Sequence, residues 1–190
     1  MIKEEGKFKW LEEGEGGRPI ILLHGLMGGI ENFGEMVDFI SVEHKVYGLD
    51  LKLFEGSLLK VSVKSLSDYL YKFMKELNLK SAVLIGNSMG GHIGLIFAKK
   101  HPEMVDGLIL TGSSGLYENA MGDSFPRRGD KDYIRKKTEE VFYDPKVADE
   151  FHSLLPNSEL HWVPLCGHAP MWEHPEEFSK IVLQWLKAKF

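Results

Sequence analysis

Residues 84–100 read LIGNSMGGHIGLIFAKK, an apolar run that reaches a glycine-flanked serine and continues as a helix-forming segment. The pattern G-x-S-x-G is met by Gly86, Ser88 and Gly90, between a predicted strand and a predicted helix. A strand that turns straight into a helix crowds the residue at the turn, and glycines on both sides relieve the crowding. The pattern therefore predicts an exposed, nucleophilic Ser88 hydroxyl. The alternative is a serine that only caps the helix among ordinary loop glycines.

The rest of the chain alternates short apolar runs with longer amphipathic segments, which predicts an α/β fold with a mostly parallel sheet flanked by helices. We expect six or seven strands. One, FKWLEE at residues 8–13, is expected to be an antiparallel edge strand. The others are RPIILLHG (18–25), HKVYGLDL (44–51), SAVLIGNS (81–88), VDGLILTGS (105–113) and, as the last strand, ELHWVPL (159–165).

Three segments have the apolar spacing of helices that pack on a sheet, at residues 66–77, 92–100 and 175–190. Residues 116–146 differ, because they mix glycine, proline and many charges before a short helical pattern. We interpret this stretch as a surface insertion, the remnant of a cap, within a single domain that spans residues 1–190.

Composition limits the kinds of partner. The chain has 190 residues, 43% of them hydrophobic, and a formal net charge of -5, so it lacks the broad basic surface that nucleic acid requires. The only cysteine, Cys166, excludes an internal disulfide and agrees with a cytoplasmic location. Apolar runs are too short to span a membrane, and the charged start does not resemble a signal peptide. We expect a small-molecule substrate and leave homo-oligomer formation open.

A serine hydroxyl needs a base that removes its proton, and His168 is the candidate. It follows the predicted last strand in LCGHAPMWEHPEEF, and the carboxyl ends of parallel strands are where sites form in open α/β sheets. The alternative is a loop histidine bonded to backbone. His174 and His101 stand next to prolines at expected helix ends, where a capping or exposed role fits better.

Acyl transfer also needs donors for an oxyanion, usually two backbone N–H groups. One donor is expected from Met89, directly after the nucleophile. The other is expected from Leu26 in the glycine-rich stretch HGLMGG, residues 24–29, which follows an apolar strand. On its own, HGLMGG is equally compatible with an ordinary turn.

These motifs together resemble the α/β-hydrolase fold family, in particular the esterases and the meta-cleavage carbon–carbon bond hydrolases. The resemblance rests on HGLMGG, GNSMGG, VDGLILTGSSG and ELHWVPLCGHAPMWEHPEEF and covers most of residues 18–190. It implies a serine hydrolase that forms an acyl intermediate at Ser88 without a cofactor, with specificity set by an inserted helical cap. Cys166, His161 and His168 do not have the spacing of a closed zinc site, so no metal is expected.

One part of the family pattern is missing. Such families carry a further strand, between VDGLILTGS and ELHWVPL, that ends in the aspartate orienting the histidine. Here that strand and part of the cap are absent around Lys146 and Val147. We therefore expect ELHWVPL to pair with residues 105–113, with a second chain, or with residues outside this sequence.

The nearest carboxylates, Asp144, Asp149 and Glu150, follow no predicted strand, and Asp50 is not the acid of the family pattern. We expect impaired catalysis. The alternative is a non-catalytic relative that binds a small ligand or a partner protein.

Overall fold

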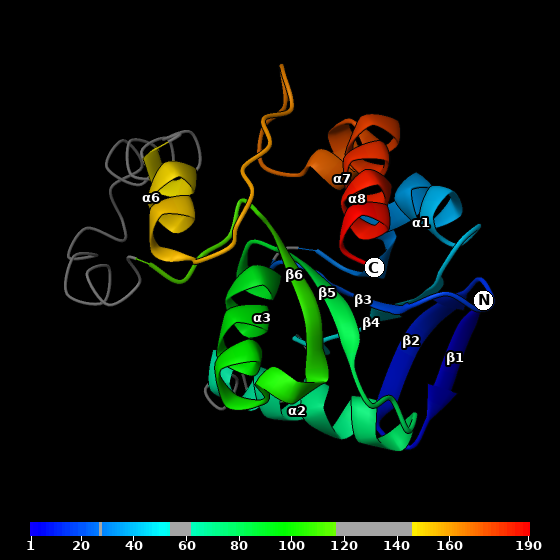
Figure 1. The fold of residues 1–190 in the computed structure, drawn as a ribbon. Helices are drawn as coiled ribbons and strands as arrows, with labels where there is room; N and C mark the ends of the chain where they lie inside the picture. Colours follow the sequence, from blue (N-terminus) through cyan, green and yellow to red (C-terminus); the bar gives the residue numbers. More distant parts are fainter. Residues whose placement is uncertain (27, 54–61, 117–145) are drawn as a thin grey trace, which may run out of the picture.

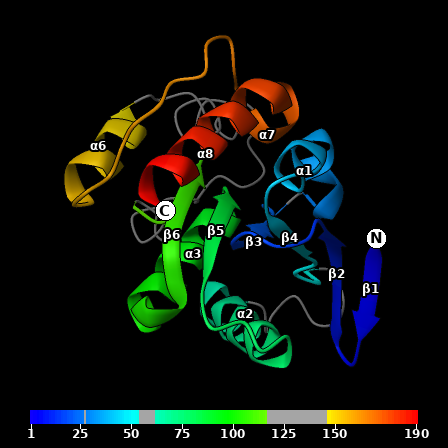
Figure 2. The ribbon, with the colours of Figure 1, turned by 45° about the vertical axis from the view of Figure 1, so that its right-hand side comes forward.

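The protein, described by a computed structural model, forms a six-stranded sheet with helices on both faces (Figure 1). The structure describes residues 1–26, 28–53, 62–116 and 146–190. The strand order is β1-β2-β4-β3-β5-β6, which can be followed in Figure 2. The strands are β1 Ile2–Glu5, β2 Phe8–Glu13, β3 Pro19–Leu23, β4 Lys45–Leu49, β5 Ala82–Asn87 and β6 Val105–Thr111.

The four strands from β4 to β6 are parallel, and β2 and β1 add to them antiparallel. From β3 the chain passes to β4 on one side, and it then returns to place β5 on the other side of β3. The loops after β3 and β5 therefore separate in opposite directions. Open α/β sheets bind their ligands at such a point, so the fold itself selects the carboxyl ends of β3 and β5 as the site.

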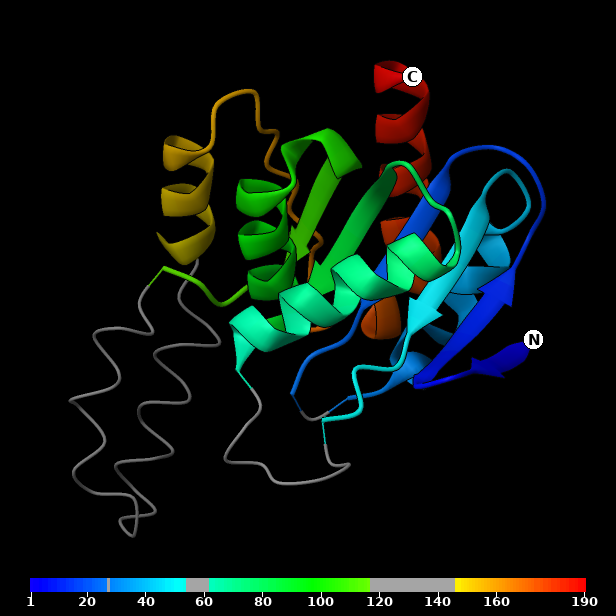
Figure 3. The same ribbon diagram turned by 90° about the horizontal axis from the view of Figure 1, so that it is seen from below.

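Side chains alternate across the sheet and produce two cores. Figure 3 looks onto the face covered by α2 Val63–Glu76 and α3 Met89–Lys100, where Ile21 and Leu23 lie buried. Ile20 and Leu22 point to the opposite face. That face is covered by α1 Gly34–Ile40, α7 Pro170–Glu173 and α8 Pro175–Lys189. Two short 3-10 turns, η1 Ile30–Phe33 and η3 Pro102–Met104, complete the connections.

The predicted α/β fold is confirmed, but two predictions about its strands were wrong: residues 8–13 are not the edge strand, and residues 159–165 are not the last strand. β2 is antiparallel as predicted, yet it is not the edge, because β1 pairs with it from Ile2 to Glu5. The fully exposed sequence IKEE has no apolar alternation that could have revealed β1. Residues 159–165 (ELHWVPL) form no strand, and Trp162 and Leu165 are 57% and 99% exposed.

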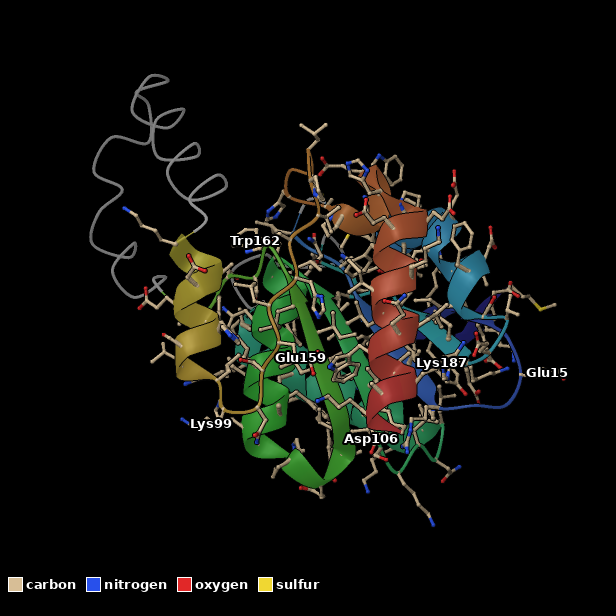
Figure 4. The ribbon with its side chains drawn as sticks, turned by 45° about the horizontal axis from the view of Figure 1, so that its top comes forward. Glu15, Lys99, Asp106, Glu159, Trp162 and Lys187 are labelled. Atoms are coloured by element: carbon tan, nitrogen blue, oxygen red, sulfur yellow. The ribbon has the colours of Figure 1, made fainter. Side chains whose placement is uncertain are left out.

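The expected pairing of residues 159–165 with residues 105–113 does not form. Within the described residues, β6 pairs only with β5, and its other edge has no strand beside it. Residues 159–165 run instead as coil between α6 Lys146–Leu154 and α7, and Glu159 in this coil, labelled in Figure 4, pairs with Lys189 of α8 at 2.8 Å. α6 begins at Lys146 and includes Val147. The expected cap remnant, residues 116–146, lies almost wholly outside the described residues.

Phe73 of α2 is the centre of the core on the α2 face. It is fully buried, and its ring centroid lies 5.6 Å from those of Phe8 and Trp10. We expect Phe73→Ala to lower the free energy of unfolding by about 3–5 kcal/mol, because it leaves a cavity among rigid strands. Phe39, 40% exposed on α1, is the matched control, and Phe39→Ala should change stability by no more than about 0.5 kcal/mol. Urea titration of both variants tests the assignment, and equal losses would contradict it.

Candidate active site

Ser88 stands at the sharp turn between β5 and α3, with φ 55° and ψ −119°. A non-glycine residue in this region costs about 1–3 kcal/mol, so the surroundings must hold it. They do so through the backbone. The Ser88 N–H donates to the carbonyl of Thr111 at 2.9 Å, and the Ser88 carbonyl accepts from Gly91 at 3.1 Å and from Ser114 at 3.2 Å. The elbow is therefore fixed by its own helix and by the end of β6.

The glycines around Ser88 permit backbone contact that a side chain would prevent. A Cβ on Gly86 would lie 2.5 Å from the amide nitrogen of Gly91, and a Cβ on Gly90 would collide with the carbonyl oxygen of Leu23. Both obstacles are backbone and cannot rotate away. Gly90 thus allows α3 to approach the end of β3, from which the predicted oxyanion loop, residues 24–29, continues.

His24 anchors that loop. It is 2% exposed, and its Nε2 accepts the N–H of Leu51 at 3.1 Å while its Nδ1 donates to the carbonyl of Gly25 at 2.9 Å. This pair of bonds requires the neutral ring. Burial accordingly lowers the pKa of His24, against the opposing influences of the Gly25 carbonyl and of Asp50. The loop is tied to the end of β4 by a single uncharged side chain.

Gly25 allows the loop to lie against Ser88. A Cβ there would lie 3.1 Å from the Cβ of Ser88. Leu26 follows directly, with its side chain 53% exposed, and Met89 is the first residue of α3, where amides have no partner inside the helix. The two predicted oxyanion donors therefore belong to segments that meet at Ser88.

The loop that carries His168 is attached to the ends of β5 and β6, next to Ser88. It follows a coil and not the predicted strand. The Asn87 amide donates to the carbonyl of His168 at 2.9 Å and to the carbonyl and hydroxyl of Thr111, both at 3.1 Å. The His168 ring packs over Gly112, where a Cβ would lie 2.5 Å from Nδ1 and where φ is +49°. Gly112 is thus required both by its backbone conformation and by the ring above it.

The environment of His168 favours a neutral imidazole. Burial lowers the pKa of His168, and the carboxylate of Glu173 acts in the opposite direction. A histidine that is neutral at and above neutral pH is able to accept a proton from a serine hydroxyl.

The other carboxylates considered from the sequence lie on different elements. Asp149 is exposed and Glu150 half-buried on α6, and Figure 1 shows α6 and α8 on opposite sides of β6. Asp144 lies outside the described residues. Asp50 does follow β4, but it accepts the N–H of Lys52 at 2.9 Å, and β3 separates β4 from β5.

Cys166, His161 and His101 were also considered from the sequence, and the structure shows their contacts. Burial, together with Glu173 and Glu177, raises the pKa of the Cys166 thiol to about 11, so the thiol is protonated and a poor nucleophile. His161 is exposed and pairs with Glu159 at 3.6 Å. His101 ends α3 and stacks on Tyr71 at 4.5 Å between ring centroids. Among the described residues, no three such side chains gather as metal ligands would.

Comparison with known proteins identifies the class. The sequence model of the family described as alpha/beta hydrolase fold matches residues 18–141, and the chain belongs to this family. A crystal structure of an alpha/beta hydrolase enzyme from the metagenome of lagoon sediments at Mar Chica, Morocco, superposes with a TM-score of 0.82. It is 38% identical in sequence, over 100% of this chain and 99% of that one.

Among curated relatives, the 2-hydroxy-6-oxo-6-(2'-aminophenyl)hexa-2,4-dienoic acid hydrolase of Metapseudomonas resinovorans is 25% identical, over 95% of this chain and 88% of its own length. That alignment runs over 256 positions, so at least 66 of them have no counterpart in the 190 residues here. The naproxen esterase of Bacillus subtilis, 17% identical over 94% of this chain and 87% of its own, shares the fold with a TM-score of 0.73. The relatives named here are hydrolases. None of the described helices is long and apolar enough to cross a membrane.

Four residues of this corner were not singled out from the sequence: His24, Asn87, Gly112 and Glu173. Asn87 precedes Ser88 and His24 opens HGLMGG. Both belong to motifs in which other residues were predicted to be functional. In the sequence, Gly112 is marked only by its position after a predicted strand, and Glu173 only by its position five residues after His168. Their roles depend on contacts between segments that are distant in the chain.

We expect Gly90→Ala to lower the free energy of unfolding by about 1–3 kcal/mol, because the added methyl group forces α3 away from the end of β3. Gly94→Ala, one turn further along the same helix, is the control. Its methyl group would meet only the flexible end of Leu108, at 2.7 Å, and alanine favours the helix by about 1 kcal/mol. Denaturant unfolding compares the two, and a Gly90→Ala protein as stable as Gly94→Ala would contradict the close approach.

The neutral state of His24 makes stability depend on pH. Its pKa in the folded protein is below the ordinary 6.5, so the unfolded chain binds the proton more tightly, and stability falls as pH drops below about 6.5. Burial lowers the pKa values of His44 and His168 as well, which adds to the same trend. His24→Gln should therefore reduce the difference in unfolding free energy between pH 7.5 and pH 5.5, whereas His161→Gln, on the surface, should preserve it. An unchanged difference in His24→Gln would show that His24 is not held neutral.

Proposed function

We propose that this chain is a serine hydrolase that acts at a carbonyl carbon, with Ser88 as nucleophile and His168 as base. Its substrate would be a small ester or a molecule with a carbon–carbon bond next to a carbonyl. The observation that carries the proposal is the strained Ser88 elbow, to which the His168 loop is tied through Asn87 and the oxyanion loop through Gly25. A strained serine, with the loop of a histidine whose pKa is lowered attached to the residue before it, supports the assignment of an activated nucleophile.

In the proposed reaction, the Ser88 oxygen attacks the carbonyl carbon while its proton passes to His168. The carbonyl oxygen becomes an oxyanion and accepts hydrogen bonds from the N–H groups of Leu26 and Met89. When the intermediate collapses, the bond to the leaving group breaks, and that group takes the proton from His168. Water then attacks the acyl-serine in the same manner, releases the acid and restores Ser88. No cofactor enters any step.

The name of the Metapseudomonas relative supports the carbon–carbon substrate class, and the fold shared with the naproxen esterase is compatible with esters. Turnover should nevertheless be slow. Among the described residues no strand follows β6, and it is such a strand that carries the triad aspartate in complete family members. Loss of that aspartate in other serine hydrolases costs on the order of ten-thousandfold in turnover.

We expect slow hydrolysis of an activated ester that falls to the uncatalysed rate in Ser88→Ala and His168→Gln. Ser113→Ala is the matched control, since this nearby hydroxyl donates to the carbonyl of Ser114 and should not affect turnover. A phosphonate inhibitor should add its mass to Ser88 and not to the Ser88→Ala protein. The same variants are assayed with an acyl dienoate to separate the two substrate classes.

Two results would count against this function. Ester turnover that survives in Ser88→Ala would exclude the nucleophile, and a protein that binds substrate analogues without turnover or adduct would be the non-catalytic relative. Asp149→Asn, Glu150→Gln and Asp144→Asn are assayed beside them. Fast turnover that is lost in just one of these would show that a carboxylate of the 144–150 region acts as the triad acid.

A further inference from the structure

Glu173, the last residue of α7, holds the backbone on both sides of His168. One carboxylate oxygen accepts the N–H of Gly167 at 2.7 Å, and the other accepts the N–H of Ala169 at 2.8 Å. A single side chain therefore brackets the histidine. Both bonds are short and charge-assisted, the kind that fixes a loop most firmly.

The opposite side of the His168 loop is fixed by the elbow itself. Asn87 donates to the carbonyl of His168, and Gly112 lies directly beneath the ring. With Glu173 on the amides before and after, the backbone of His168 is held at three points. The ring of His168 packs against Gly112.

The Glu173 carboxylate is charged at neutral pH. Its bonds to the Ala169 and Gly167 amides lower its pKa, while partial burial acts the other way. The charge also reaches the histidine ring, because Glu173 raises the pKa of His168 against the effect of burial.

The other elements around His168 bring few charges to it. β5 and β6 contribute Asn87 and Gly112, which are uncharged. The start of α8 contributes His174, which acts on Glu173, and Glu177, which acts on Cys166. Among the described residues, Glu173 is thus the carboxylate whose field acts on the proposed base.

We infer, on the basis of the hydrolase function proposed above, that Glu173 is the positioning residue of His168. Its carboxylate orients the histidine through the backbone of residues 167–169 and stabilises the imidazolium that forms when Ser88 loses its proton. It supplies from α7 part of what a triad aspartate supplies from a strand end, although it does not bond to the ring in the manner of that aspartate. Because Glu173 acts through the His168 loop, it should affect the rate of the chemical step and not binding.

The test is Glu173→Gln, which keeps the size of the side chain, removes the charge and replaces one acceptor oxygen with an NH₂ group facing an amide N–H. Glu177→Gln is the matched control, with the same loss of charge four residues further along and no bond to the loop. Both proteins are assayed with an activated ester across pH. In parallel, the ring protons of His168 are titrated by NMR and assigned with His168→Gln.

For Glu173→Gln we expect kcat to fall on the order of a hundredfold with KM unchanged, because the base is misplaced relative to the nucleophile. The acid limb of kcat/KM and the NMR titration of His168 should both move to lower pH, because the imidazolium loses its counter-charge. Glu177→Gln should match the wild type in all three. Glu173→Asp, which keeps the charge but shortens the reach, should retain most of the His168 titration while losing turnover.

Wild-type kcat in Glu173→Gln would overturn the inference. A fall in kcat with an unmoved His168 titration would overturn it as well, because a merely structural residue gives that result. The NMR titration does not depend on hydrolysis. If Ser88 turns over no ester and the His168 titration still moves in Glu173→Gln, the proposed function fails while the coupling between Glu173 and His168 stands.

Discussion

The side-chain amide of Asn87 is the contact on which the site depends. Its two N–H groups are shared among three acceptors, on Thr111 and on His168, and so they join the end of β5 to the end of β6 and to a loop eighty residues away. The neighbouring residue, Ser88, is held in its strained conformation by the same Thr111 carbonyl. If the end of β6 moved, Ser88 and the His168 loop would move together. Correct spacing between them therefore depends on one junction and not on two independently placed loops.

That junction stands at the margin of the sheet. Among the described residues β6 has a partner on one side only, and its residues from Val105 to Leu110 are half-buried where those of β5 are almost wholly buried. The relative with 256 aligned positions has at least 66 that this chain lacks, which is ample for a strand and a cap. The turn at Ser88 depends on contacts with β3 and β6 and with its own strand, β5. Among the described residues no strand lies beyond β6, and the His168 loop is held by Asn87 and by Glu173.

Much of the fold could be predicted from the sequence, because periodicity reports burial. Leu66, Leu70 and Phe73 repeat at helical spacing and are buried on α2, and the run PIILL is buried throughout as β3. Burial does not report pairing. The strand β1 has no buried residue, and residues 159–165 have the pattern of a strand although they pair with no strand of the sheet. The Ser88 and His168 motifs were readable because they are local patterns, whereas the bonds from Glu173 to the amides around His168 appear only once α7 has folded back.

The loop at Leu26 is held by a neutral histidine and the loop at His168 by a carboxylate, so the two loops should respond to acid at different pH. His24 secures the oxyanion loop as a neutral group whose Nε2 must accept, so protonation would set a donor against the Leu51 N–H. Glu173 secures the base loop as an anion, which protonates only well below neutral pH because its pKa is lowered. Burial lowers the pKa of both His24 and His168, so each takes up its proton only below the ordinary value of 6.5, and Glu173, whose pKa is lowered from 4.5, stays charged over the same range. Acid should therefore protonate the proposed base and loosen the loop at Leu26 before it releases the loop at His168.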